Sequence, residues 1–424
     1  NIIFLRNKEG NSQVFLFISY LLKIQVIFVT KMNVLKIQLY INLVLALLLI
    51  FRYHDIYFEV YLVILILALL VRKNKKIFQL ISIIFLPVIF VDQLTYSMRL
   101  LIEILPNMSV IIYILYLAGL LVVIIPVTKE AYGVIKNPLF QLLATIWFTT
   151  VIAGSSPAKL ENLEPNTLLY GLNNSAIIYG LPVFIYVYVV IREWGYRFHF
   201  NLPFNFSNKR NVIVLIIAVV LAIWISLFSV FSYLARSWSE VFWNWDLSLI
   251  NPSKSYRIEN IWELFFSCGR AGIIEENERY INLLLLLAIF RKSRRRIEWA
   301  IIISSLIFAS LHILNVLSRP PYETPIKDVG YQIVSAFGVG CFLAVLLLYT
   351  GKLWLTMLLH AFIDVVAFSI TSIGIIGNSA ILSFFEQTIL SLACWLILAV
   401  LLFIRNKDLI NHNVQILTKN QSLI

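Results

Sequence analysis

A chain of 424 residues that is 60% hydrophobic and only 13% charged is too apolar for a soluble protein, which carries about twice that share of charge. Its net charge of +12 does not indicate a nucleic-acid partner, because no soluble basic face with interleaved aromatic residues is present. The three cysteines, Cys268, Cys341 and Cys394, lie in or beside apolar runs and lack C-x-x-C spacing, so neither a disulfide framework nor a thiolate metal site is supported.

Apolar runs long enough to cross a bilayer recur along the whole chain and predict an all-α, polytopic transmembrane helical bundle. The eighth run is too long for one span, so we expect its outer part, with Glu263 and Arg270, at or above the membrane interface. About twelve spans are predicted, with cores at 35–51, 56–71, 77–92, 108–127, 139–154, 175–191, 212–234, 261–290, 298–318, 331–350, 353–372 and 382–404.

The predicted spans divide the chain into four parts. Residues 1–31 are interpreted as an upstream extension or weak N-terminal segment, because Met32 could be the natural start. Residues 32–209 are membrane helices of unknown role with almost no ionisable residue away from their ends, and we expect them to wrap the working core. Residues 210–404 hold that core, and 405–424 form a tail.

Lysine and arginine accumulate in every second loop. The clusters at 72–76, 129–136, 192–210, 291–296 and 405–407 all fall on one side of the predicted spans. Because short cytoplasmic loops carry the excess of positive charge, the pattern predicts a multi-pass cell-membrane protein with both termini in the cytoplasm. The Lys/Asn/Ile-rich composition is typical of AT-rich coding sequence and favours a bacterial host.

Three late spans contain strongly polar residues at a similar depth. An ionised side chain near the bilayer centre costs roughly 2.5–3.5 kcal/mol on insertion scales, so such residues usually hold or react with something. At 1.5 Å per residue, the three sets fall in one band of the membrane and predict a single site. The candidate residues are Glu275, Glu276 and Arg279 in the eighth span, Phe308 and His312 in the ninth, and His360 and Asp364 in the eleventh.

The spacing within each span predicts which side chains cooperate. Glu275 and Arg279 are four residues apart and are expected to form an ion pair on one helix face. Glu276 points about 100° away and is expected to face a different neighbour. His360 and Asp364 share a face, and Phe308, one turn before His312, would wall the site.

These residue types suit the activation of a water molecule. A carboxylate in a low-dielectric pocket has a raised proton affinity and can act as a general base. A neighbouring histidine can orient the water or pass its proton to a leaving amine, and a second histidine can stabilise an oxyanion. The reaction that fits is hydrolysis of a peptide bond within the membrane.

The three constellations resemble the CPBP family of intramembrane proteases (CAAX proteases and bacteriocin-processing, Abi-like proteins). Its signature is E-E-x-x-x-R, F-x-x-x-H and H-x-x-x-N/D on successive membrane helices. The second and third motifs match at Phe308 to His312 and at His360 to Asp364. The resemblance covers roughly 210–404 and implies that Glu275 and His312 activate the water. His360 and Asp364 would then form the oxyanion pocket, and no cofactor would be needed.

The first motif departs from the family pattern, because only two residues separate the glutamate pair from Arg279. Alignment on the paired glutamates gives Glu275 the place of the catalytic glutamate. Alignment on the arginine makes Glu275 the second glutamate and puts Ile274 in the catalytic place. We favour the first alignment, because the chemistry requires a carboxylate. Asp364 could donate to an oxyanion only when protonated, so it could instead orient His360 or a water molecule.

Several other functions are compatible with the same residues. Twelve spans with an intramembrane Glu/His/Asp set also fit a proton-coupled transporter, although the two halves show no matching polar pattern. A non-catalytic membrane protein for immunity or binding would retain the residues without turnover, and the charged pair could simply lock helix packing. Two histidines and a glutamate could bind zinc, but H-E-x-x-H spacing is absent. The expected partners are a membrane-embedded or membrane-associated peptide substrate and the lipid bilayer.

Overall fold

The computed structural model describes residues 34–155, 157–161, 163–165, 167–232, 234–250, 260–317, 325–369 and 381–419. The predicted extension 1–31, position 233 in the predicted span 212–234, the ends of the predicted spans at 318 and 370–372, and the last five residues of the tail lie outside these ranges. The principal helices are α2 (Val34–Tyr53), α3 (Ile56–Leu70), α4 (Lys75–Ile84), α5 (Leu86–Ile104), α6 (Ser109–Val127), α7 (Pro138–Gly154), α8 (Leu168–Asn174), α9 (Gly180–Glu193), α10 (Lys209–Phe231), α11 (Trp238–Phe242), α12 (Ile261–Ile289), α13 (Arg296–Leu311), α14 (Ile326–Thr350), α15 (Leu353–Phe368), α16 (Phe384–Arg405) and α17 (Lys407–Leu417).

The described residues are helical, as the apolar runs predicted, and contain no strand beyond one isolated bridge between Asn201 and Lys352. Six of the helical segments are long and apolar enough to cross a membrane, or up to eight if each of two bent pairs is one span. Helices α7 and α15 are apolar but shorter, and α12 contains the charged cluster. The count of about twelve spans therefore stays a prediction.

The described part of the chain divides into two compact units between Leu70 and Val71. The first unit contains α2 and α3, which pack together along their length. Their turn is tight because His54 adopts a positive φ of 50°, and the Asp55 carboxylate accepts a hydrogen bond from the backbone N–H of Tyr57 at 3.0 Å. An aspartate that accepts from a nearby N–H stabilises such a turn.

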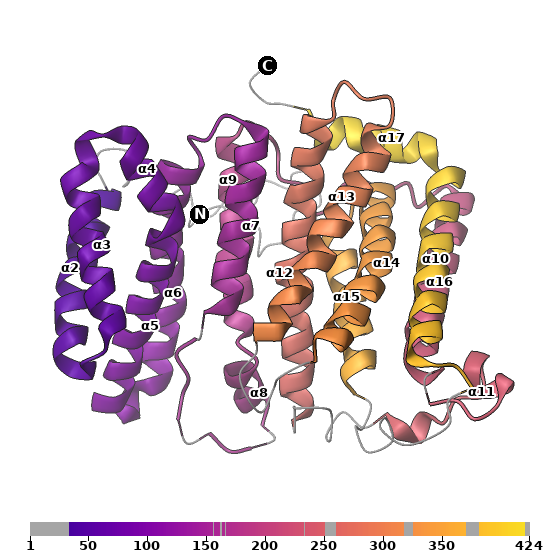
Figure 1. Cartoon of the computed structure of the whole chain (residues 1–424), viewed down its shortest axis with the longest axis horizontal. Helices are drawn as coiled ribbons and strands as arrows, with labels where there is room; N and C mark the ends of the chain where they lie inside the picture. The colour runs from indigo at the N-terminus through magenta and orange to yellow at the C-terminus, as the bar shows by residue number, and fades with distance from the viewer. Residues whose placement is uncertain are drawn as a thin grey trace, which may run out of the picture. The chain divides into compact units, whose positions relative to one another are not determined.

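In the second unit, α12 lies among the other helices (Figure 1) and contacts α7, α8 and α9 as well as α13 and α15. The first half of the chain was expected only to wrap the core. Helices α7 to α9 contact α12, the helix that carries the glutamates, and the role of residues 32–209 stays a prediction. Helix α17 lies across one end of the long helices (Figure 1) and contacts α14.

Local sequence signals position α12 and its neighbours. The Asn260 side chain caps the first turn of α12 by accepting from the N–H groups of Trp262 and Glu263, as expected for an asparagine N-cap. Helix α14 ends at Gly351, whose φ of +65° is a conformation that glycine adopts without strain. The chain then turns directly into α15, which returns through the same layer beside α12.

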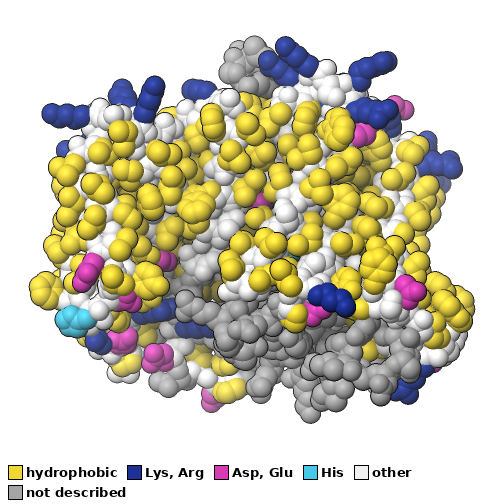
Figure 2. All heavy atoms as spheres, in the orientation of Figure 1, with side chains coloured by type: hydrophobic (Ala, Val, Ile, Leu, Met, Phe, Trp, Pro, Cys, Tyr) yellow, Lys and Arg dark blue, Asp and Glu magenta, His cyan; other side chains and the backbone are white. Residues whose placement is uncertain are grey.

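One end of the second unit is basic. Lys and Arg side chains gather along the edge at which α12 ends and α13 begins, and an apolar belt covers the sides of the helices (Figure 2). The segment between α9 and α10 joins the α14–α15 turn at this end, because Lys352 donates to Asn201 Oδ1 at 2.6 Å and to the carbonyl of Leu202 at 3.2 Å. Burial lowers the pKa of Lys352. Among the described residues, the basic edge agrees with the predicted alternation of loop charge.

Candidate active site

Close approach of α12 and α15 creates the site. A Cβ atom at Gly272 would lie only 2.5 Å from the carbonyl oxygen of Met357, so the absence of a side chain lets the two helix backbones touch. One turn further along each helix, the glutamates of α12 meet His360 of α15. A larger residue at position 272 would push these groups apart.

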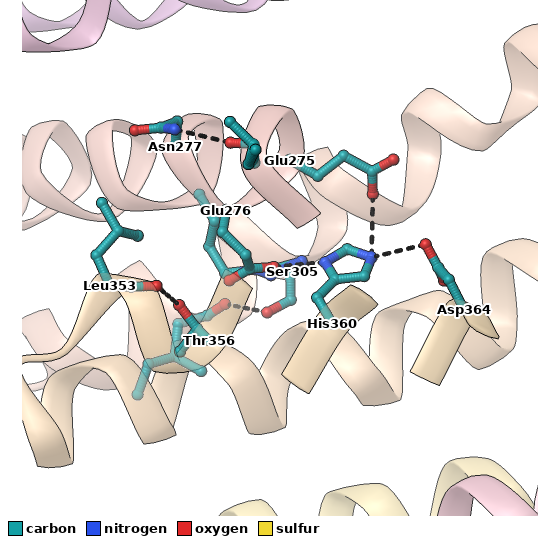
Figure 3. Close-up of polar contacts among 11 residues, drawn as sticks. Glu275, Glu276, Asn277, Ser305, Leu353, Thr356, His360 and Asp364 are labelled. Carbon is teal, nitrogen blue, oxygen red and sulfur yellow. Dashed lines mark hydrogen bonds and ion pairs between the residues drawn. The ribbon is translucent and has the colours of Figure 1, made fainter. Parts of the chain in front are cut away.

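His360 is the centre of the constellation (Figure 3). Its Nδ1 lies 2.7 Å from Glu276 Oε1, and its Nε2 lies 3.4 Å from Glu275 Oε2 and 3.7 Å from Asp364 Oδ2. The imidazole is nearly buried, whereas the side chains of Glu275 and Asp364 remain 32% and 21% exposed. The site therefore has a closed side, at Glu276, and an accessible side, where two carboxylates face one ring nitrogen.

The closed side is a buried ion pair. Glu276 binds the guanidinium of Arg279, and both side chains are fully buried. The guanidinium carbon also lies 4.1 Å from the centre of the Phe308 ring, a geometry in which the ring quadrupole attracts a cation. The predicted Glu275–Arg279 pair is therefore wrong. Glu276 is the partner, because the second glutamate faces inward while Glu275 turns toward the accessible side.

Phe308 joins the second motif, to which it belongs, to the other two. Its ring packs edge-on against the rings of His312 and His360, with centroid distances of 5.2 and 5.7 Å. His312 lies at the end of α13 with its Nδ1 3.2 Å from the carbonyl oxygen of Phe308, and it is half-buried. The three motifs thus meet as the depth argument predicted, although among the described residues no hydrogen bond or ion pair joins His312 to Glu275.

Sequence reasoning missed a second buried carboxylate interaction. Glu278 of α12 accepts a hydrogen bond from the Thr149 hydroxyl of α7 at 2.9 Å, and Asn282 donates to its other oxygen at 3.4 Å. A threonine in an apolar helix usually bonds its own backbone, as Thr149 also does, so its sequence gave no signal. Through this bond, the first half of the chain contributes a partner for a buried carboxylate of α12.

Other polar atoms near the site are unsatisfied. Among the described residues, Glu276 Oε2 and two guanidinium nitrogens of Arg279 have no hydrogen-bond partner. An unpaired buried polar atom costs about 1–3 kcal/mol, so these unpaired atoms reduce the net stabilisation that the ion pair provides. The described residues contain no group of three or more His, Cys, Asp or Glu side chains with a geometry that could hold a metal ion.

These observations define a helical membrane protein with a carboxylate–histidine site between α12, α13 and α15. Residues 257–366, which hold all seven predicted site residues, match the family model for Rce1-like type II CAAX prenyl endopeptidases. This match confirms the resemblance to the CPBP intramembrane proteases for that part of the chain. A search of curated proteins gave no match, and neither did a search of solved structures.

Proposed function

We propose that this protein is an intramembrane endopeptidase that hydrolyses a peptide bond with a water molecule activated by Glu275. The observation that carries the proposal is the arrangement around His360, with two partly exposed carboxylates at Nε2 and a buried one at Nδ1. The family match over the same helices supports a proteolytic reading of this geometry.

The proposed roles follow from exposure and contact. Glu275, the exposed member of the pair, accepts a proton from water, and the resulting hydroxide attacks the carbonyl carbon of the substrate. The proton that Glu275 has taken is then passed by His312 to the leaving amine as the C–N bond breaks. His360 and Asp364 stand at the developing oxyanion. Glu276 and Arg279 are positioning residues, because they contact the imidazole or its ring neighbours from the closed side.

The alignment on the paired glutamates gains support from the ion pair. Glu276 binds Arg279 across three residues rather than four, so the shortened motif still lets the second glutamate bind the arginine. Glu275 is then left as the accessible carboxylate. The alternative alignment would place the aliphatic Ile274, which is buried, in the catalytic position.

We further propose that the protein crosses the cell membrane about twelve times, with the protease core at 210–404 and both termini in the cytoplasm. Helices α3, α7, α12 and α15 would complete the count beyond the eight candidate spans. The basic edge would face the cytoplasm, at the inner leaflet of a bacterial membrane. The substrate would be a membrane-embedded or membrane-associated peptide, and bacteriocin processing or self-immunity is the process we propose.

The test is cleavage of a quenched membrane-peptide library by the purified protein in detergent, with Glu275→Gln and His312→Gln as variants. We expect turnover to fall at least a hundredfold in both, while thermal melting of both stays close to wild type. Asp364→Asn serves as a matched comparison, because an amide can donate to an oxyanion at neutral pH, and it should retain turnover. Wild-type protein that binds peptides without cleaving them would instead favour a non-catalytic immunity or binding protein.

A further inference from the structure

A groove lies between α4, the segment after the π-helix Thr128–Tyr132, and α7. Its volume is about 560 Å³, within the range of sites that bind small ligands. Lys76 and Lys136 line one end, and the remainder is mainly apolar, with Leu80, Phe140 and Trp147 among the lining residues. These three side chains are 41% to 61% exposed, so the groove opens to the surroundings of the helices.

The groove exists because a helix is broken. Helices α4 and α5 meet at an angle of 49°, and Pro87 at the start of α5 cannot donate to the carbonyl of Ile83, four residues earlier. The Tyr132 hydroxyl donates to that carbonyl at 2.7 Å, and the Trp147 indole N–H donates to the carbonyl of Ile84 at 3.0 Å. Two side chains therefore satisfy the broken backbone and hold the walls in place.

The dimensions of the groove match one leaflet of a bilayer. From Lys76 to Ile84 along α4 the rise is about 12 Å, and from Asn137 to Trp147 along α7 it is about 15 Å. The hydrocarbon core of a bilayer is about 30 Å thick, so half of it is about 15 Å. A molecule with a headgroup at the two lysines would place its hydrocarbon beside the apolar walls down to the middle of the membrane.

The charge at the mouth favours an anionic headgroup. Lys76 and Lys136 are both exposed, and neither has an acidic partner among the ion pairs of the described residues. Basic pockets at this level of a membrane protein bind anionic lipid headgroups, with about 1 kcal/mol from each Lys or Arg near the surface.

We propose that this groove binds one anionic phospholipid of the leaflet at the basic end, with its phosphate between Lys76 and Lys136 and an acyl chain along α4 and α7. The opposite face of α7 carries Thr149, which bonds Glu278 of α12. The bound lipid thus packs against α7, which is joined by this bond to the helix that carries the glutamates of the candidate active site.

The test compares phosphatidylglycerol with phosphatidylcholine of the same acyl chains, added to the delipidated full-length protein and counted by native mass spectrometry. Wild type should retain one phosphatidylglycerol in preference to phosphatidylcholine. Lys76→Gln with Lys136→Gln should reduce that preference roughly 25-fold, about fivefold for each lysine. Lys73→Gln with Lys75→Gln is the control, because it removes two exposed charges from the same end without changing the groove lining.

A second measurement does not depend on the lysine variants. Phosphatidylglycerol brominated on its acyl chains should quench the fluorescence of wild type, and Trp147→Phe should lose the component that phosphatidylcholine does not produce. Leu80→Trp, which fills the groove without changing charge, should lower phosphatidylglycerol retention. No preference in wild type, equal loss in both lysine pairs, or quenching unchanged by Trp147→Phe would each overturn the proposal.

Discussion

The adjacent glutamates of α12 should respond in opposite ways to the same substitution. Glu276→Gln removes the charge that balances Arg279, whose side chain is fully buried. Breaking a buried ion pair by removing one partner costs about 3–5 kcal/mol, because the remaining charge has no compensation. Glu275 is 32% exposed and lies 3.4 Å from His360, so Glu275→Gln should change stability by less than about 1 kcal/mol.

The assay is thermal melting of the purified variants in one detergent, measured together with peptide cleavage. Glu276→Gln should lower the melting temperature by about 3–6 °C, whereas Glu275→Gln should abolish cleavage and melt near wild type. The double variant Glu276→Gln with Arg279→Met should recover most of the lost stability, because it removes both charges.

Two results would refute this reasoning. Wild-type melting in Glu276→Gln would mean that the Arg279 charge is balanced elsewhere, and the buried ion pair would not be the closed side of the site. Equal melting losses in Glu275→Gln and Glu276→Gln would mean that exposure does not distinguish the two carboxylates.

Three further substitutions test the helix contacts and the basic end. Gly272→Ala should lower the free energy of unfolding by about 1–3 kcal/mol and lower turnover by moving α15 away. Its control is Gly269→Ala, which meets only ordinary contact at 3.5 Å and should melt at or above the wild-type temperature. Equal melting temperatures in the two variants would contradict the close approach. Thr149→Val should lower the free energy of unfolding by about 1–3 kcal/mol, because the buried carboxylate loses a hydrogen bond. The Thr150 hydroxyl has no partner, so Thr150→Val should leave stability unchanged. An unchanged stability in Thr149→Val would argue against the bond to the carboxylate. Burial and the nearby guanidinium of Arg197 lower the pKa of His199 from 6.5, so the unfolded chain takes up a proton that the folded chain does not. Stability should be complete above about pH 6.5 and decrease below it, by at most about 1.4 kcal/mol per pH unit; an identical pH profile in His199→Gln would exclude this histidine as the cause.

The helical membrane class and the location of the site could be predicted from local sequence. Apolar runs of bilayer length specify helices, because each helix satisfies its own backbone hydrogen bonds. The charged cluster at 275–279 and the two later histidines stand out because an apolar span rarely accepts them. The i,i+4 spacing of His360 and Asp364 was sufficient to predict that they address one point.

Pairing within the site depended on the tertiary structure. Glu275 and Glu276 are the same residue type and adjacent in sequence. Helical spacing alone favoured Glu275 as the partner of Arg279, whereas the partner is Glu276. Contact with α13 and α15 decided the matter, because the face of α12 that packs against these helices buries Glu276 and leaves Glu275 accessible.

Contacts between distant parts of the chain also had no sequence signal. Thr149 lies 129 residues before the carboxylate that it binds, and nothing in an apolar run distinguishes it from Thr150. The sequence by itself determined which segments are helices and which residues are costly to bury, since both follow from the chemistry of each segment. Only the tertiary structure decided which buried charges meet, since that depends on which faces of separate helices pack together.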